Sequence, residues 1–385
     1  PYYIKKSDVV HHRVYASIGS KRDPDDCGMP GNGHWLMAES DVKAAFAANH
    51  KYIDSAIVED AMAMSGIIAE SLNARMRVDK LNCLVPQITL PEGVDEDTHL
   101  RNLCNRGWSQ LRKIPERARK RALKSGVDPE ALINVYANRL EIELAALAAK
   151  KFASYILVVQ EVFDFARSKK IYVGPGRGSG AGSLVNYLVG ITSVDPIEHG
   201  LLFERFISPG RNDMPDIDMD FEKERRVEII EWLRKKYDSE HVAQIATLMR
   251  LKGKAIFSEV CKKFGINDPA TKAIGKEINA LMFKRKAGDA RYVMTVLDAM
   301  QKDFAIPFAE KYPHIVEHCR VLEGKMRHCG THAAAVVACP SLLRDVAPIE
   351  SAVDRATNKR VSIVALDMNG AAAASLLKLD VLGLK

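Results

Sequence analysis

The sequence predicts an α/β protein, and three patterns carry this prediction. Apolar and acidic residues alternate from Met214 to Phe221, which is typical of a strand with one packed face. A short β-like stretch, a glycine-rich turn and a helical segment follow one another from Ile171 to Val189. Amphipathic helical patterns fill much of the remaining chain.

The segment MPDIDMDF (214–221) predicts a cation site. If it is a strand, Asp216, Asp218 and Asp220 share one face, and the apolar residues between them share the other. Anions spaced about 6–7 Å apart along one face repel one another unless a cation lies among them. Hard oxygen ligands of this kind suit Mg²⁺ or Mn²⁺. An acidic run is more often a solvated loop, but the interleaved apolar residues favour a strand.

The segment YVGPGRGSGAGSLV (172–185) predicts a phosphate cradle. Glycines let backbone N–H groups approach a ligand closely, and a helix that begins between Ser179 and Ser183 would add partial positive charge. Arg177 could neutralise phosphate charge there, while Ser179 and Ser183 could cap the helix or donate to phosphate. The alternative is a glycine-rich turn that binds no ligand.

Two other phosphate-binding loops fit this segment less well. A Walker A loop ends in Gly-Lys-Ser/Thr, and no lysine follows these glycines. A dinucleotide-binding fingerprint can be placed on Gly176, Gly178 and Ala181 with Asp195 as the ribose ligand. However, Asp195 precedes Pro196 and therefore looks like the start of a helix. That fingerprint also leaves the three aspartates unexplained.

Together these segments resemble the C-family replicative DNA polymerases, the family of the bacterial and phage DNA polymerase III alpha subunits. Their order and spacing also agree with the family. The matching segments are VGPGRGSGAGSLV (173–185), DP (195–196), LLFERF (201–206), MPDIDMDF (214–221), LEG (322–324), GTHAAAVV (330–337) and LDVLGL (379–384).

The resemblance implies a palm domain like that of polymerase-beta-type nucleotidyltransferases, with a mixed sheet flanked by helices, plus a helical thumb. It assigns catalysis and metal binding to Asp216, Asp218 and Asp380, with two Mg²⁺ ions (or Mn²⁺) as cofactors. The implied reaction is template-directed DNA synthesis, in which a primer 3′-hydroxyl attacks the alpha-phosphate of a dNTP and pyrophosphate leaves. Lys378 would share the face of Asp380 on a regular strand, either in the charge cluster or in a structural ion pair.

The resemblance also implies nucleic-acid and nucleotide contacts. It places the incoming triphosphate at Gly178 and Ser179. The expected phosphate-binding residues are Arg177, Gly178, Ser179, Gly180, Arg205 and Arg211. The expected DNA-binding residues of the thumb are Lys252, Lys254, Lys284 and Arg285, which would contact phosphates without reading sequence.

Four regions are expected from the resemblance. Residues 1–85 would be the end of a PHP domain with junction helices, and residues 86–246 the first part of the palm. Residues 247–324 would form the thumb, and residues 325–385 would complete the palm. The fingers and clamp-binding regions of the family are expected to lie beyond residue 385. The chain is therefore expected to be a fragment, or one part of a split polymerase.

Local patterns predict several individual elements. Helices are expected at 40–49, 58–72, 138–166 and 222–237, and a strand at 241–246. Residues 247–322 also look helical and are rich in lysine and arginine. A basic helical region from Arg101 to Lys124 could contact phosphate, although a solvated helix face explains it at least as well.

Composition is compatible with these expectations. The 385 residues carry a net charge of +7, which suits a nucleic-acid partner without requiring one. Seven cysteines without a CxxC pair indicate reduced thiols and a cytoplasmic location, in a host cell if the protein is phage-encoded. The sequence shows no apolar run of membrane-spanning length, so no membrane partner is expected. Expected partners are primer–template DNA, dNTPs and, through regions outside this chain, a sliding clamp and other replisome subunits.

Three alternatives remain from the sequence. The chain could bind DNA and nucleotide without turnover of its own, or it could be a nucleotidyltransferase that ignores template. Separately, His328, Cys329, His332 and Cys339 could be drawn as a zinc site. Their spacing matches no recognised finger, so packed palm residues are the better interpretation.

Overall fold

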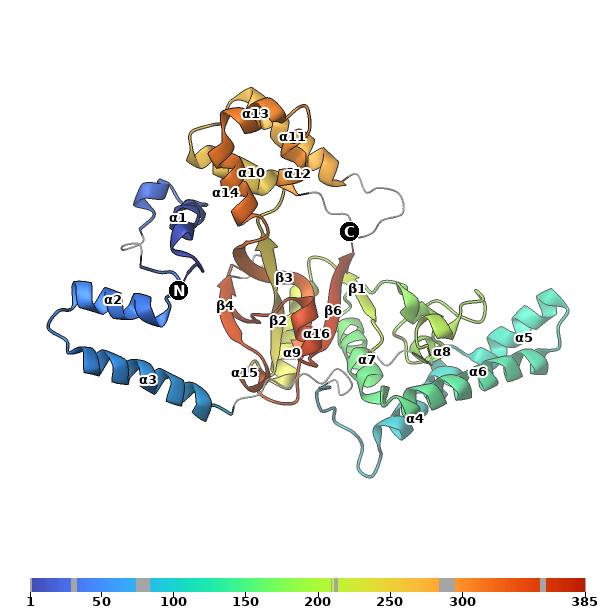
Figure 1. Cartoon of the computed structure of the whole chain (residues 1–385). Coiled ribbons are helices and arrows are strands. Elements are labelled where there is room, and N and C mark those ends of the chain that lie inside the picture. The colour runs from blue at the N-terminus through green and yellow to red at the C-terminus, as the bar shows by residue number, and fades with distance from the viewer. Residues whose placement is uncertain are drawn as a thin grey trace. The chain divides into compact units, whose positions relative to one another are not determined.

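The computed structural model describes residues 2–28, 33–73, 84–208, 210, 214–283, 295–353 and 358–384. Arg211, Lys284 and Arg285, three of the predicted site residues, lie outside these ranges. The chain divides into two compact units (Figure 1). The first unit comprises Pro1–Arg75 and Leu248–His328, and the second comprises Met76–Thr247 and Cys329–Lys385.

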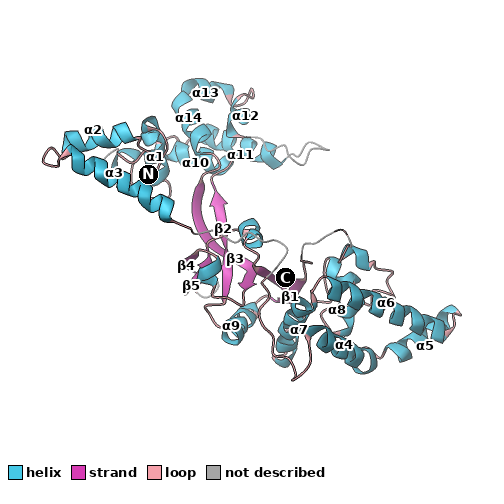
Figure 2. Cartoon of the chain, turned by 60° about the horizontal axis from the view of Figure 1, so that its bottom comes forward, coloured by secondary structure: helices cyan, strands magenta, loops and turns pink. Residues whose placement is uncertain are grey.

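The second unit holds most of a six-stranded mixed sheet (Figure 2). The strands are β1 (Asp218–Glu222), β2 (Val242–Arg250), β3 (Met326–Ala338), β4 (Ile349–Val353), β5 (Arg360–Val364) and β6 (Leu377–Leu384). Their order is β1-β6-β3-β2-β5-β4. Strand β6 runs parallel to β1 and antiparallel to β3. The predicted fold class, an α/β protein with a mixed sheet flanked by helices, is confirmed.

The two faces of the sheet bury different cores, because successive side chains on a strand point to opposite faces. Val336 and Ala338 of β3 belong to a core that also contains Met219 and Phe221 of β1 and the apolar sides of α7 and α9. The intervening Val337 belongs to a second core with residues of α15 and α16. The acidic residues of β1 alternate with Met219 and Phe221, so they lie on the face opposite α7 and α9.

Helices of the second unit surround this sheet and extend away from it (Figure 1). They are α4 (Glu96–Arg106), α5 (Ile114–Ser125), α6 (Pro129–Ala149), α7 (Ala153–Ser168), α8 (Leu184–Leu188), α9 (Arg226–Tyr237), α15 (Leu343–Val346) and α16 (Met368–Ala373). Capping residues in the local sequence set where some of these helices begin. At the start of α4, the Asp95 side chain accepts a hydrogen bond from the N–H of Thr98. Asp128 followed by Pro129 begins α6 in the same manner.

The prediction of one helix over 138–166 is wrong. Helix α6 ends at Ala149 and α7 begins at Ala153. Between them Lys151 has a left-handed backbone, with φ of +56°. No glycine or proline marks this break, and both helices bury apolar faces in one core, so the apolar pattern continues across it. The predictions at 222–237 and 241–246 correspond to α9 and the start of β2.

The first unit is mainly helical. Its helices are α1 (Val9–Ser17), α2 (Glu39–Asn49), α3 (Ser55–Ser71), α10 (Lys254–Lys263), α11 (Pro269–Phe283), α12 (Val296–Met300), α13 (Ile306–Lys311) and α14 (Pro313–Leu322). Val14 of α1 shares one core with residues of α10 to α14. The predicted helices at 40–49 and 58–72 are confirmed by α2 and α3. Within the described ranges, no helix has the length and apolar character needed to span a membrane.

Candidate active site

Three aspartates from two strands of the second unit converge. Asp216 precedes β1, Asp218 begins it, and Asp380 lies in β6. The parallel pairing of β1 with β6 places Asp218 opposite Asp380. One carboxylate oxygen from each of the three residues lies within 4.8 Å of the other two. The structure therefore brings together the three acids that the family resemblance assigned to catalysis and metal binding, and we refer to them below as the aspartate triad.

Two basic side chains neutralise part of this negative charge. The Lys378 Nζ atom lies 2.7 Å from Oδ2 of Asp380 and 3.8 Å from Oδ1 of Asp216. The prediction that Lys378 shares the face of Asp380 is confirmed. The second is Arg177 of the glycine-rich segment, whose Nε atom lies 3.7 Å from Oδ2 of Asp218. Its Nη2 atom lies 3.6 Å from Oδ1 of Asp220.

The electrostatics of the triad suit a divalent cation. Partial burial raises the pKa of Asp216, and the nearby Asp380 and Asp218 carboxylates raise it further, although Lys378 opposes the shift. A bound cation would attract all three carboxylates and so offset the repulsion between them. Three hard oxygen donors so close together fit Mg²⁺ or Mn²⁺, so the residues present suit the metal that the sequence predicts.

The glycine-rich segment lies directly against β1. Val173 forms an antiparallel bridge with Phe221, and the Gly174 N–H donates to the carbonyl oxygen of Asp220 at 2.8 Å. Gly178 has φ of +66° and ψ of −155°, a conformation essentially restricted to glycine. A Cβ atom on Gly178 would lie 3.1 Å from Oδ2 of Asp218. Glycine at 178 thus lets the turn approach the triad.

The predicted helix after this turn differs from the observed one. Ser179–Gly182 forms one turn of 3₁₀-helix, and α8, which follows, has only five residues. The buried Glu143 accepts hydrogen bonds from the N–H groups of Leu184 and Val185, at 2.9 and 3.0 Å. An internal carboxylate therefore occupies the N-terminus of α8, and the predicted phosphate cradle is limited to the turn that precedes this helix.

Glu143 is the residue near this site that sequence analysis missed. Its carboxylate also accepts hydrogen bonds from the Ser183 hydroxyl at 2.8 Å and from Nε of Arg139 at 2.7 Å. Ser183 in turn caps α8 by accepting the N–H of Asn186. Its hydroxyl is thus committed within the protein. The Arg139–Glu143 spacing of four residues was the one available signal, and many exposed helical pairs share it.

The other predicted phosphate-binding residues lie around the same segment. Gly180 is buried, and its carbonyl accepts a hydrogen bond from Nδ2 of Asn186 at 3.0 Å. The 3₁₀ turn that contains Ser179 and Gly180 packs against a second 3₁₀ turn, Phe203–Arg205. Ser179 is half-buried, and Arg205 is exposed at the end of that second turn.

The basic region from Arg101 to Lys124 is partly committed to internal contacts. Arg101 pairs with Glu141 at 2.6 Å, and Arg112 donates from Nε to the carbonyl of Tyr187 at 2.8 Å. Arg117 donates to the Tyr187 hydroxyl at 2.6 Å. These contacts favour a structural role for the three arginines over phosphate binding.

The predicted DNA-binding lysines that the structure describes lie in the first unit. Lys252 and Lys254 line an open groove of about 650 Å³ on α10 and α11, together with Lys262 and Lys272. Glu259 also lines this groove and pairs with Lys262 at 3.6 Å. The groove therefore has an excess of positive charge.

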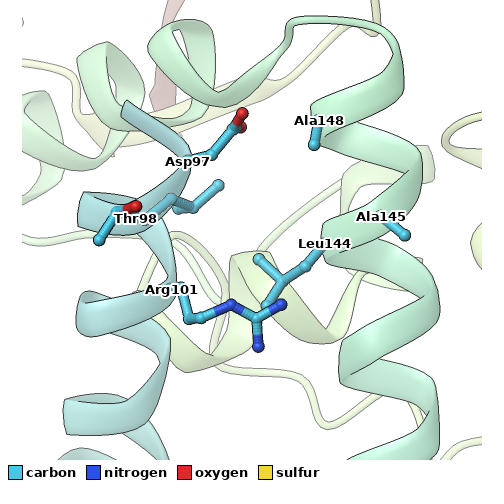
Figure 3. A pocket seen from close by; sticks show the side chains of 7 residues that line it. Asp97, Thr98, Arg101, Leu144, Ala145 and Ala148 are labelled. Atoms are coloured by element: carbon cyan, nitrogen blue, oxygen red, sulfur yellow. The ribbon is translucent and has the colours of Figure 1, made fainter. Parts of the chain in front are cut away.

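A smaller cavity of about 180 Å³ lies between α4 and α6 in the second unit (Figure 3). Asp97, Thr98 and Arg101 line one side, and Leu144, Ala145 and Ala148 of α6 line the other. None of the predicted site residues that the structure describes lines this cavity. It therefore contributes nothing to the candidate active site.

The alternative zinc site does not form. Across the described ranges, the aspartate triad is the only cluster of three or more His, Cys, Asp or Glu side chains close enough to share a metal ion. Nδ1 of His332 instead accepts the backbone N–H groups of Ala334 and Ala335. Cys339 is buried in the core shared with α15 and α16.

One family model and several curated proteins match this chain. Residues 98–383 match the family described as the bacterial DNA polymerase III alpha NTPase domain. The whole chain is 32% identical to DNA polymerase III subunit alpha of Bacillus subtilis and covers 31% of it. It is 33% identical to the subunit of Pseudomonas fluorescens, again covering 31%, and 30% identical to that of Thermus aquaticus, covering 34%.

The chain thus spans about a third of the length of the curated relatives that it matches. The family match includes the glycine-rich segment, β1 and β6, which together build the triad and its surroundings. On this basis the chain belongs to the bacterial DNA polymerase III alpha family.

Proposed function

We propose that the second unit is the nucleotidyl-transfer site of a template-directed DNA polymerase. The observation that carries this proposal is the convergence of Asp216, Asp218 and Asp380 within 4.8 Å, beside a glycine turn. The family match adds weight, because the relatives carry the name of a DNA polymerase subunit.

In this proposal the triad holds two divalent ions, Mg²⁺ or Mn²⁺. Ions bound there would stabilise the attacking and leaving oxygens at the alpha-phosphate of the dNTP. The chain's own residues provide the rest. Lys378 limits the repulsion among the carboxylates, and the turn at Gly178 and Ser179 presents backbone groups and a hydroxyl to the triphosphate. Arg177 lies at the edge of the same cluster, where its charge can be shared with a phosphate.

We further propose that the first unit contributes duplex binding. The lysines at 252, 254, 262 and 272 surround one groove, and such side chains bind phosphates through charge. Binding of this kind weakens steeply with salt and does not depend on base sequence. The proposed domain names follow the family: the triad belongs to the palm, 247–324 to the thumb, and 1–85 to the end of a PHP domain.

Primer extension tests the proposal. Labelled primer–template, Mg²⁺ and dNTPs are mixed with the chain. The reaction is run with the chain alone and again with an added polypeptide that contains the regions of a full-length relative that this chain does not cover. We expect extension that follows the template base in the complete mixture, and its loss in Asp216→Asn and Asp380→Asn. Both variants should still bind the duplex. The matched control is Asp303→Asn, an exposed carboxylate outside the triad.

Two outcomes would contradict the proposal. Wild-type extension by the triad variants would remove the assignment of catalysis, and extension that ignores the template base would favour a template-independent nucleotidyltransferase.

Replacing Ser179 with leucine tests the turn separately. It should weaken nucleotide use more than duplex binding, because the half-buried side chain belongs to the proposed phosphate turn. An equal loss of both would argue against that role.

A further inference from the structure

Asp220 lies on the same face of β1 as Asp218, and it is not part of the triad. Only 8% of the residue is exposed. Its carboxylate lies 3.6 Å from Nη2 of Arg177, whereas Asp218 lies 3.7 Å from Nε of the same guanidinium. Burying a carboxylate costs free energy unless the carboxylate is paired with a cation. The contact with Arg177 offsets this cost for Asp220.

Asp220 also fixes the start of the glycine-rich segment through its backbone. Its carbonyl oxygen accepts the N–H of Gly174 at 2.8 Å. A Cβ atom on Gly174 would lie only 2.8 Å from Cβ of Asp220, so the two chains approach as closely as glycine permits. One residue of β1 therefore contacts the segment twice: at Gly174 through the main chain and at Arg177 through the side chain.

The two carboxylates that share Arg177 differ in what else they can do. Asp218 has an oxygen in the triad, and a dication bound there would repel the guanidinium. Arg177 is half-exposed, so it could then turn into solvent. Asp220 lies outside the triad, within a strand, and is nearly inaccessible to water. It can keep its contact with Arg177 while Asp218 binds a cation.

We propose that Asp220 is a positioning residue that holds Arg177, and with it the Gly178–Ser179 turn, beside the triad when a divalent cation is bound. This inference rests on the proposed function in assigning the triphosphate to that turn. It goes further in giving Asp220 a role that differs from metal binding. The contribution of Asp220 to triphosphate binding is then exerted through Arg177.

A double-mutant cycle tests the coupling without any ligand. Backbone amide hydrogen exchange is measured for residues 174–182 in the wild type, Asp220→Asn, Arg177→Met and the double variant. We expect each single variant to speed exchange about three- to tenfold, and the double variant to be no faster than either single one. The control is Arg344→Met, which removes an exposed arginine from a 3.0 Å ion pair with Glu240 and should not alter this segment.

Binding measurements on the same proteins separate positioning from metal ligation. The probes are Mn²⁺, followed by electron paramagnetic resonance, and dTTP in the presence of Mn²⁺. Asp220→Asn should leave the Mn²⁺ dissociation constant within about twofold and weaken dTTP about three- to tenfold, as Arg177→Met does. Asp218→Asn should weaken Mn²⁺ itself.

The possible outcomes are distinct. A loss of Mn²⁺ affinity in Asp220→Asn as large as that in Asp218→Asn would make Asp220 a metal ligand and overturn the inference. Additive effects in the double variant would overturn it as well, because Asp220 would then act independently of Arg177. If the wild type binds neither Mn²⁺ nor dTTP, the proposed function fails, while the exchange cycle still decides whether Asp220 orders the segment through Arg177.

Discussion

Asp218 and Asp380 occupy the same register position of the parallel pair formed by β1 and β6. Residues at one register position of neighbouring strands lie about 4.8 Å apart in the sheet and share a face. The sheet itself therefore forces two carboxylates together, and Asp216 joins them from the residues just before β1. Lys378 offsets part of the resulting repulsion.

The triad should bind a divalent cation as a unit. We expect Asp218→Asn or Asp380→Asn to weaken Mn²⁺ binding at least about tenfold, since even substitutions outside the ligand shell cost that much at metal sites. The thermal stability of the metal-free protein should change much less than the Mn²⁺ affinity, because each variant removes both a repulsion between carboxylates and an ion pair, with Arg177 or with Lys378. Electron paramagnetic resonance and thermal unfolding measure the two effects. Unchanged Mn²⁺ affinity would mean that the cluster is not the metal site.

Lys378 should lower the pKa of Asp216. The lysine opposes the rise caused by partial burial and by the neighbouring carboxylates, so Lys378→Met should raise the pKa of Asp216 further. Carbon-13 NMR of labelled aspartate in the metal-free protein follows this titration. Lys236→Met, which breaks an ion pair with Glu161 elsewhere in the second unit, serves as the control. A pKa that does not move would show that Lys378 is uncoupled from Asp216.

Gly178 should resist substitution for two separable reasons. Its φ of +66° with ψ of −155° disfavours any residue with a side chain, at a cost of about 1–3 kcal/mol. A Cβ atom would also crowd Oδ2 of Asp218. Gly178→Ala should therefore lower both stability and Mn²⁺ affinity. Gly126→Ala is the matched control, because Gly126 has φ of +69° with open space around it and should lose stability alone.

Glu143 should be among the most sensitive residues of the second unit. Replacing it with alanine leaves the N–H groups of Leu184 and Val185 and Nε of Arg139 without their partner. The expected loss is about 3–5 kcal/mol of unfolding free energy, as for other broken buried pairs. Glu141→Ala removes an exposed pair from the same helix and should cost less than about 1 kcal/mol. Urea unfolding compares the two, and equal losses would contradict the role given to Glu143.

The first unit should lose stability in mild acid because of His318. Burial, helped by His11 and His314, lowers the pKa of His318 to about 4. Nδ1 of His11 lies 2.9 Å from Nδ1 of His318. Between the ordinary pKa of 6.5 and this value the unfolded chain binds a proton that the folded chain does not, so stability is full above pH 6.5 and falls as the pH drops toward 4.

By pH 5 this effect should reach about 1–2 kcal/mol after allowance for solvent screening. In His318→Asn this part of the pH dependence should disappear. Unfolding measured between pH 7 and pH 5 compares the two proteins, with His50→Asn, an exposed histidine, as the control. An identical pH dependence in wild type and His318→Asn would show that His318 does not titrate in this way.

Local patterns in the sequence identified much of the site because its chemistry is local. Alternation in 214–221 determines which side chains of β1 enter the core, and the structure places Ile217, Met219 and Phe221 there. The glycines at 174 and 178 mark where the neighbouring segment must approach β1 closely. The prediction that failed nearby concerned the helix after Ser179, because no local pattern shows that Glu143 of another helix binds its N-terminus.

The sequence by itself thus determined the kinds of side chain at the site and the face of β1 on which they lie, since period-two alternation and glycine conformation depend only on near neighbours. Tertiary structure alone decided the rest: that Asp380 pairs in register with Asp218, that Arg177 is held between Asp218 and Asp220, and that Lys151 divides two helices. These relationships join residues distant in the chain, or a strained backbone that packing stabilises, and a one-dimensional pattern contains no record of either.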